Sequence, residues 1–250
     1  MNHPSFIKAS SFGGYITSWS VFDPLKKKYV EIFYQGRSLQ RTGIPVLFPC
    51  WSTSGTTLRR HGFGRDFDWK TVKKTESSAT FLLDSRKIMN EIQQEFPYDF
   101  RVRIVVTAKK NNLFYSMKVD NKGTDDMPIS PAIHPYFYIK HEDKKFIKTI
   151  GIKGFSAHNF NWDNAPPDND YSFRKKAEIF FPGRKIVIED LTKPSVISYM
   201  VVWSQTKEMP DSDFICFEPL TALVGAIAEK KILVRPKETW EMKLKITTYF

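Results

Sequence analysis

Three segments of the chain bring together residue types that could do chemistry on a small molecule. Residues 41–69 place His61 among arginines and glycines, residues 127–138 hold His134 in an apolar run, and residues 213–221 contain Glu218. Histidine and glutamate side chains can donate and accept protons in catalysis. Glycines on both sides of Phe63 allow unusual backbone angles and a close approach of a ligand. These residue types indicate a small-molecule site that uses proton transfer.

Glu218 lies in an otherwise apolar strand pattern, FICFEP. Side chains two residues apart share a face of a strand, so Glu218 shares its face with Phe214 and Cys216. An ionised carboxylate on an apolar face is costly unless it is paired or functional. Each candidate also has a purely structural reading when taken singly: a core histidine, a glutamate paired at a strand end, or an arginine paired on the surface.

Several other chemistries have no motif in this chain. Its five histidines form neither an HExxH nor an HxH pattern, which argues against a metal site. No GxSxG, Walker or GxGxxG motif supports a serine hydrolase or a nucleotide-binding protein. Cys50 and Cys216 lack CxxC spacing and are too few for a disulfide framework. We therefore expect no metal and no cofactor.

The net charge of the chain is large but does not by itself identify a binding partner. The 250 residues carry 38 Lys and Arg against 27 Asp and Glu, a formal net charge of +11. The basic residues occur in short clusters along the whole chain rather than in one stripe, so we expect neither a nucleic-acid nor a membrane partner. No signal peptide and no apolar run of 18 residues is present, and the expected location is the cytoplasm.

Period-two patterns dominate the chain and predict the strands that position these residues. In residues 100–108, Phe100, Val102 and Ile104 alternate with mostly polar residues. Asn111-Asn112 then predicts a tight hairpin turn into a second alternating segment. Residues 85–96 alone hint at a short helix. The other expected strands cover residues 15–22, 29–34, 79–83, 113–119, 186–189, 196–203, 214–218 and 240–247.

Many short strands and almost no helical periodicity predict an all-β protein, a large antiparallel sandwich or barrel. With 41% apolar residues, the chain can build a substantial core. No internal repeat, low-complexity tract or long linker divides it. We therefore expect residues 1–250 to form a single domain.

The segments together resemble the aldose 1-epimerase, or galactose mutarotase-like, superfamily, most closely its hexose-6-phosphate epimerase branch. RTGIPVLFP is similar to that branch's RGGIP-x-x-FP, and HGFGRDFDW is similar to HGFAR-x-x-x-W. FPYDF, AIHPYF and FICFEP follow in the family's order across residues 41–221. The resemblance implies a large antiparallel β-supersandwich that holds a sugar in an open cleft on one concave sheet face.

The resemblance also implies a role for each matching residue. Glu218 matches the family's glutamate base and His134 its histidine acid, which together interconvert α and β anomers by opening and reclosing the sugar ring. His61 matches a second histidine that holds the sugar oxygens. Arg41 and Arg65 fall where the phosphate-handling branch carries arginines, which suit a phosphate group. The implied partner is a small sugar or sugar phosphate, and the implied protein is an isomerase that works as a monomer or weak dimer.

The chain departs from the family pattern at three points. Arg60 stands where the branch usually has glutamine, and we include it among the substrate-binding residues. Thr42 replaces the first glycine of a Gly-Gly pair. The stretch KAEIFF at 176–181 lacks the sugar-binding aspartate of a D-R-I-Y or D-R-V-Y motif, for which Asp170 or Asp168 could substitute.

Two other functions remain open at this point. The missing aspartate motivates a non-catalytic carbohydrate-binding module on the same fold, because a fold does not fix a function. A glycoside hydrolase or lyase would need a second catalytic carboxylate beside Glu218.

Overall fold

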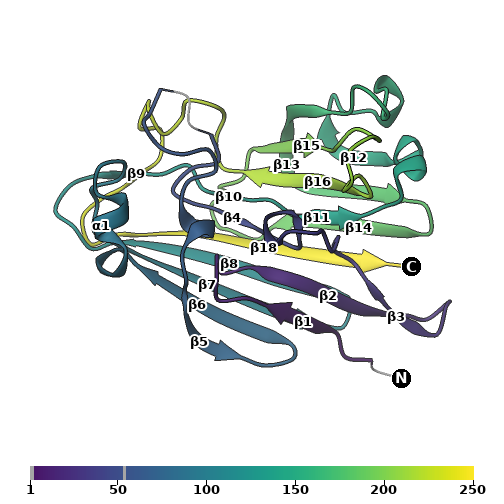
Figure 1. The fold of residues 1–250 in the computed structure, drawn as a ribbon, viewed down its shortest axis with the longest axis horizontal. Coiled ribbons are helices and arrows are strands. Elements are labelled where there is room, and N and C mark those ends of the chain that lie inside the picture. The colour runs from purple at the N-terminus through teal and green to yellow at the C-terminus, as the bar shows by residue number, and fades with distance from the viewer. Residues whose placement is uncertain (1–2, 53–54) are drawn as a thin grey trace.

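The computed structural model describes residues 3–52 and 55–250, which form three sheets of antiparallel strands (Figure 1). The strands are β1 Phe6–Ala9, β2 Ile16–Asp23, β3 Lys28–Glu31, β4 Val46–Leu47, β5 Lys70–Lys74, β6 Ser78–Asp84, β7 Phe100–Lys109, β8 Asn112–Asn121, β9 Met127–Pro128, β10 Ala132–Ile133, β11 Tyr136–Tyr138, β12 Lys148–Lys153, β13 Asp168–Phe181, β14 Arg184–Asp190, β15 Tyr199–Trp203, β16 Phe214–Leu220, β17 Leu233–Val234 and β18 Thr239–Tyr249. The all-β, large antiparallel architecture predicted from the alternation is confirmed.

Thirteen of the strands belong to one large sheet. Its order is β4-β10-β16-β15-β13-β14-β18-β8-β7-β6-β5, with β11 also paired to β16 and β12 to β13. β18 lies between β14 and β8, so it joins the half of the sheet that contains β16 to the half that contains β7. The remaining strands form the sheet β1-β2-β3 and the pair β17-β9.

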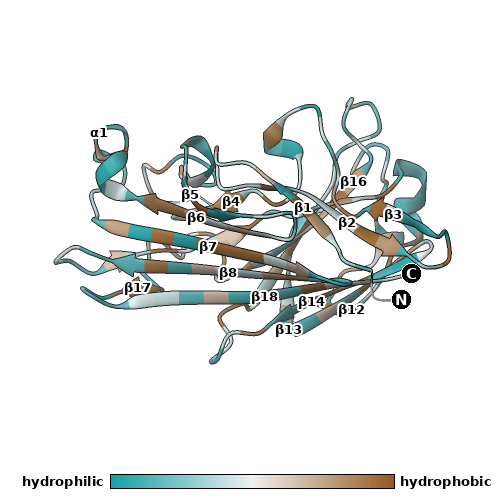
Figure 2. Cartoon of the chain, turned by 90° about the horizontal axis from the view of Figure 1, so that it is seen from below, coloured by the Kyte–Doolittle hydropathy of each residue, from teal (hydrophilic) through white to brown (hydrophobic). Residues whose placement is uncertain are grey.

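The main core lies between the β1-β2-β3 sheet and the large sheet. Figure 2 shows β1 to β3 lying across the large sheet, and brown and teal alternate along β7. Trp19 of β2 is fully buried, as are Phe81 of β6 and Val102 and Ile104 of β7. Side chains of β7 alternate between buried and more exposed along almost its whole length. This alternation is what fixes the register of a sheet with one covered face.

The helical segments are short. Residues 85–96 contain the 3-10 helix η3, Ser85–Lys87, and the single α-helix of the described residues, α1, Met89–Ile92. The other 3-10 helices are η1 Leu39–Arg41, η2 Gly64–Asp66, η4 His141–Phe146 and η5 Ala157–Asn159. Among these described residues, no helix has both the length and the apolar character that crossing a bilayer requires.

Several boundaries differ from the prediction, among them the end of β3, which stops at Glu31 rather than at residue 34, and two others show why. The hairpin turn falls at Lys110-Asn111, because Asn112 pairs with Lys109 and already belongs to β8; Lys110 takes the positive φ, 55°. β15 begins at Tyr199 rather than at residue 196. The backbone N–H of Val196 instead donates to the carboxylate of Asp190, the last residue of β14, 3.0 Å away.

β13 is a strand that the sequence reading missed. It runs for 14 residues, and its first half is largely exposed and polar. It pairs with β15 through residues 168–172 and with β14 through residues 176–181. Lys175 between these stretches has a positive φ of 62°. The alternation is therefore interrupted where β13 changes its pairing partner. The first residues of β13 include Asp168 and Asp170, which lie on the same sheet face as Glu218.

Candidate active site

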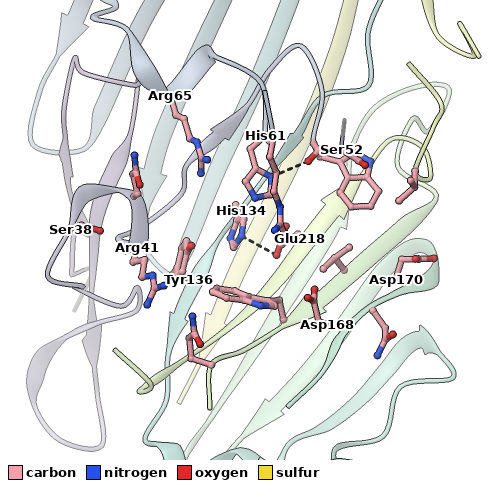
Figure 3. Close-up of a pocket in the computed structure, with 18 residues that line it drawn as sticks. Ser38, Arg41, Ser52, His61, Arg65, His134, Tyr136, Asp168, Asp170 and Glu218 are labelled. Atoms are coloured by element: carbon pink, nitrogen blue, oxygen red, sulfur yellow. Dashed lines mark hydrogen bonds and ion pairs between the residues drawn. The ribbon is translucent and has the colours of Figure 1, made fainter. Parts of the chain in front are cut away.

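A cavity of about 720 Å³ opens on the large sheet beside β16. All seven residues predicted for the site line it: His134, Glu218, Arg41, Arg60, His61, Arg65 and Asp170. The alternative aspartate, Asp168, lines it as well. Figure 3 shows Arg41 and Arg65 on one side of His134 and Glu218, and the two aspartates on the other. The fold thus brings together residues that lie up to 177 positions apart.

The position of His134 follows from a break in the sheet. It falls between β10 and β11, which pair with β16 on either side of it in one continuous register. That register places His134 opposite Glu218. The backbone N–H of His134 donates to the carbonyl of Pro45, 3.0 Å away, which fixes the break against the residue preceding β4.

His134 and Glu218 form a buried pair. Nε2 of His134 lies 3.2 Å from Oε1 of Glu218, and both side chains are less than a tenth exposed. The ring of Tyr136 stacks on His134 at 4.6 Å between centroids, while Trp203 meets it edge-on at 5.6 Å. Aromatic rings on these sides keep the imidazole in one orientation toward the carboxyl group.

Burial shifts the two pKa values in opposite directions. It raises the pKa of Glu218 well above the usual glutamate value, helped by the negative charge of Asp168. It lowers the pKa of His134 well below the usual histidine value, helped by His61. Both shifts disfavour the charged form of the group concerned. The pair therefore holds one proton between its two members over a wide pH range.

His61 is held over the cavity by an unusual backbone. It has a positive φ of 68°, and Gly62 follows with a φ of 64°. A Cβ on Gly62 would come within 2.1 Å of the carbonyl oxygen of Phe48, so only glycine fits there. Nδ1 of His61 lies 3.0 Å from the carbonyl oxygen of Trp51, which can only accept, so Nδ1 carries the proton and Nε2 is left as an acceptor. Burial lowers the pKa of His61 to about 4.

The three arginines of the cavity carry charge without a protein counter-ion. Within the ranges that the structure describes, Arg41, Arg60 and Arg65 form no ion pair, and Nε of Arg65 is buried without a hydrogen-bond partner. Arg59, by contrast, binds the carboxylates of Glu95 and an aspartate outside the cavity. Unpaired guanidinium groups beside a cavity are suited to an anionic ligand.

The two aspartates reach the cavity from β13. Asp170 pairs with Val201 of β15, which in turn pairs with Glu218 of β16, so the three residues form one cross-strand row. Asp168 lies two residues before Asp170, so both aspartates share the face of Glu218. Both are exposed, and Figure 3 shows Asp168 pointing closer to Glu218 than Asp170 does. Asp168 is also the group whose charge acts on the pKa of Glu218. The structure therefore gives Asp168 the more central place of the two.

Three aromatic residues of the cavity were missed by the sequence reading: Trp51, Tyr136 and Trp203. Tyr136 was quoted in AIHPYF, but only as part of a motif. Trp203 lies two residues from Val201 on β15, so alternation puts both on one face, and the pairing of Val201 with Glu218 makes it the face of Glu218. Trp51 lies outside any strand, and its indole N–H donates to the carbonyl of Ala222 at 2.8 Å. No periodic signal could have found it.

A group of possible metal ligands also comes together here. In the described part of the chain, ligand atoms of His134, Cys216 and Glu218 lie within 4.8 Å of one another, and all three residues are buried. Nε2 of His134, however, already faces the carboxyl group of Glu218. We therefore treat His134 and Glu218 as proton-transfer groups.

Comparison with known proteins gives consistent matches. The sequence model of the family "Aldose 1-epimerase" matches residues 3–183, a span that contains His134 but ends before Glu218. Protein LacX of Lactococcus lactis is 25% identical over 214 residues, covering 70% of this chain and 67% of its own length.

Two solved structures have similar folds. A galactose mutarotase related enzyme from Lactobacillus acidophilus has a TM-score of 0.74 at 20% identity, covering 100% of this chain and 98% of its own. A galactose mutarotase-like protein from Lactobacillus casei has a TM-score of 0.76 at 16% identity, with the same coverage. At these identities the structures establish the fold, a galactose mutarotase-like one, and no more.

Proposed function

Because this chain belongs to the aldose 1-epimerase family, we propose that it interconverts the α and β anomers of an aldohexose or hexose 6-phosphate. The observation that carries the proposal is the buried contact of 3.2 Å between His134 and Glu218 at the wall of the cavity. Ring opening at C1 needs one group that accepts a proton and one that donates a proton, held on the same sugar. This pair has that composition.

The reaction conserves the single proton of the pair. In the favoured neutral pair this proton lies on Glu218, and it first passes across the 3.2 Å contact to Nε2 of His134. Glu218, now the carboxylate, accepts the proton of the C1 hydroxyl while His134 donates its proton to the ring oxygen. The bond between C1 and the ring oxygen breaks, leaving an aldehyde, a protonated Glu218 and a neutral His134. After rotation about the C1–C2 bond the same steps run backward and close the ring on the other face. Both residues then have the protons with which they began.

The other lining residues hold the sugar for this exchange. Nε2 of His61 can accept a hydrogen bond from a hydroxyl group, and Asp168 and Asp170 can accept others. Trp203 lies in the same cross-strand row as Asp168 and offers an apolar surface. Positioning of this kind can supply much of the rate acceleration.

The unpaired arginines favour a phosphorylated substrate over a neutral one. A sugar phosphate brings two negative charges, and guanidinium groups bind phosphate oxygens through paired hydrogen bonds. Arg41 and Arg65 both lie on the side of the cavity opposite the aspartates (Figure 3). We propose that they bind the phosphate and that Arg60 contributes from the rim.

The direct test follows anomer exchange on pure α-glucose 6-phosphate and α-glucose, by polarimetry or exchange NMR. The wild-type protein is expected to exceed the buffer rate on the phosphate ester. Saturable binding without exchange would favour a carbohydrate-binding module, and release of reducing sugar from a glycoside would favour a hydrolase. Either result would overturn the proposed activity.

The pH dependence follows from the shared proton. The pair of His134 and Glu218 works only while it holds one proton. It gains a second proton only at a pH far below the usual histidine pKa, and it loses its one proton only at a pH far above the usual glutamate pKa. We expect kcat/KM, corrected for buffer catalysis, to stay level through neutral pH. It should fall near pH 4, where His61 gains a charge beside His134. An acid limb between pH 6 and 7 would contradict this assignment.

Substitution of Arg65 tests the phosphate proposal. With Arg65→Ala we expect kcat/KM for glucose 6-phosphate to fall by about 10- to 100-fold, the usual effect of losing a charged hydrogen-bond partner. Activity on glucose should barely change, and Arg65→Lys should recover part of the loss. Arg103→Ala, on an exposed face of β7, is the matched control. An equal fall on both sugars would make Arg65 a structural residue.

A further inference from the structure

A second cavity, of about 500 Å³, shares no lining residue with the candidate active site. It lies where β3, β11 and the start of β14 meet, and its walls are mostly apolar. The apolar residues that line it are Val30, Phe33, Tyr34, Ile139, Phe181 and Phe250. Nothing in the anomer exchange uses this part of the molecule.

The guanidinium of Arg184 lies beside these apolar residues. Arg184 is half-buried, its guanidinium lies 4.9 Å from the ring centroid of Phe181, and one Nη donates to the carbonyl of Tyr138. A guanidinium has five N–H donors, so most of them remain available. Across the ranges covered by the structure, no carboxylate lies within ion-pair distance of Arg184. Burial lowers its pKa to about 10, so it remains charged at neutral pH.

The carboxylate whose charge acts on Arg184, Glu31, is already hydrogen-bonded to other groups. Oε1 of Glu31 accepts from the backbone N–H groups of Trp19 and Phe33, at 2.8 and 3.1 Å. Its Oε2 accepts from the hydroxyl of Ser18 at 2.5 Å. These bonds hold Glu31 to the β2–β3 hairpin, from where its charge acts on the pKa of Arg184 although the two form no ion pair among the described residues. A half-buried guanidinium without its own carboxylate is costly unless a ligand supplies one.

The other charged groups of the cavity do not fill that place. Lys26 pairs with Asp23 and Lys140 with Glu142, outside the cavity wall. Asp143 lines the cavity from η4 but forms no ion pair with Arg184 among the described residues. The guanidinium of Arg184 is therefore the one cation of the lining that has no carboxylate partner among the described residues.

We propose that this cavity binds a monocarboxylate with an apolar body, its carboxylate on Arg184 and its hydrocarbon against Phe33, Phe181 and Phe250. Two parallel N–H groups of a guanidinium match the two oxygens of a carboxylate. The volume lies within the range of small-molecule sites, which are mostly apolar with a few placed polar groups. A phosphate has no hydrocarbon body and would leave the rings of Phe33, Phe181 and Phe250 without a partner.

The test uses decanoate labelled with 13C at its carboxyl carbon and decanol as the uncharged control. We expect saturable binding of decanoate, with a shift of the carboxyl resonance and of the amide signals of Gly183 and Phe250. Arg184→Met should weaken decanoate binding at least about tenfold and leave decanol unchanged. Arg184→Lys should keep part of the affinity, and Arg174→Met, exposed on β13, should behave like wild type.

Three results would overturn the site. Decanoate could bind no better than decanol, Arg184→Met could bind as well as Arg174→Met, or the shifts could map to the cavity of His134 instead. Because NMR titration needs no turnover, the outcome is independent of any anomer exchange. Retained amide dispersion in Arg184→Met would show that a loss of binding is not a loss of folding.

Discussion

Glu218→Gln is expected to lower kcat/KM for anomer exchange by about 1,000-fold or more, within the range attributed to a positioned acid or base. The amide cannot accept the proton of the C1 hydroxyl. It has nearly the shape of a protonated glutamate, however, and can still donate a hydrogen bond to Nε2 of His134. The folded structure should therefore survive, and polarimetry on α-glucose 6-phosphate should show a rate close to that of the buffer.

The control for this substitution is Glu142→Gln, whose carboxylate is exposed on η4 and does not line the cavity. It should keep full activity. Thermal unfolding of both variants separates loss of chemistry from loss of fold. If Glu218→Gln kept more than about a tenth of wild-type activity, Glu218 could not be the base.

The second large effect is expected for His134→Gln. Among the described residues, this change removes the one cavity side chain that faces Glu218 at hydrogen-bond distance, so the ring oxygen loses its proton donor. We expect kcat/KM to fall by about 100- to 10,000-fold. His158→Gln, on exposed η5, is the matched control and should be silent.

The two substitutions should also be strongly non-additive. Residues that exchange one proton act as a unit, so the double variant should be little worse than the poorer single one. Fully multiplicative losses would show that His134 and Glu218 act in separate steps. This measurement tests the shared proton more directly than either rate alone.

Much of the fold could be predicted from alternation, because a strand with one covered face has apolar residues at every second position, and these positions specify its register. β7, β8, β16 and β18 were found this way, and with them the direction of Glu218. β13 was missed because its first half is polar and exposed, so no apolar face marks it. The aspartates that β13 carries could be named only as alternatives, since their places depend on pairing with β15.

The candidate site was predictable where a motif supplies the residue and its backbone together. His61 is such a case, since Gly62 beside it reveals a turn that other residues cannot adopt. The state of the arginines was not predictable. Arg59 and Arg60 are neighbours in sequence, yet Arg59 binds Glu95 while Arg60 lines the cavity. Which of the two arginines pairs with a carboxylate depends on where segments that are distant in sequence lie in the folded protein.

The central place of β18 has a consequence for the time at which the protein becomes active. β18 follows every residue of the cavity in the chain, yet it fills the middle of the large sheet between β14 and β8. Until it is in place, both neighbours present open edges. Such non-local pairings form slowly, because the loops must close before the contacts are made. During refolding, anomer exchange should return together with hydrogen-exchange protection of β18, so the strand made last decides when the sheet, and the cavity on it, is complete.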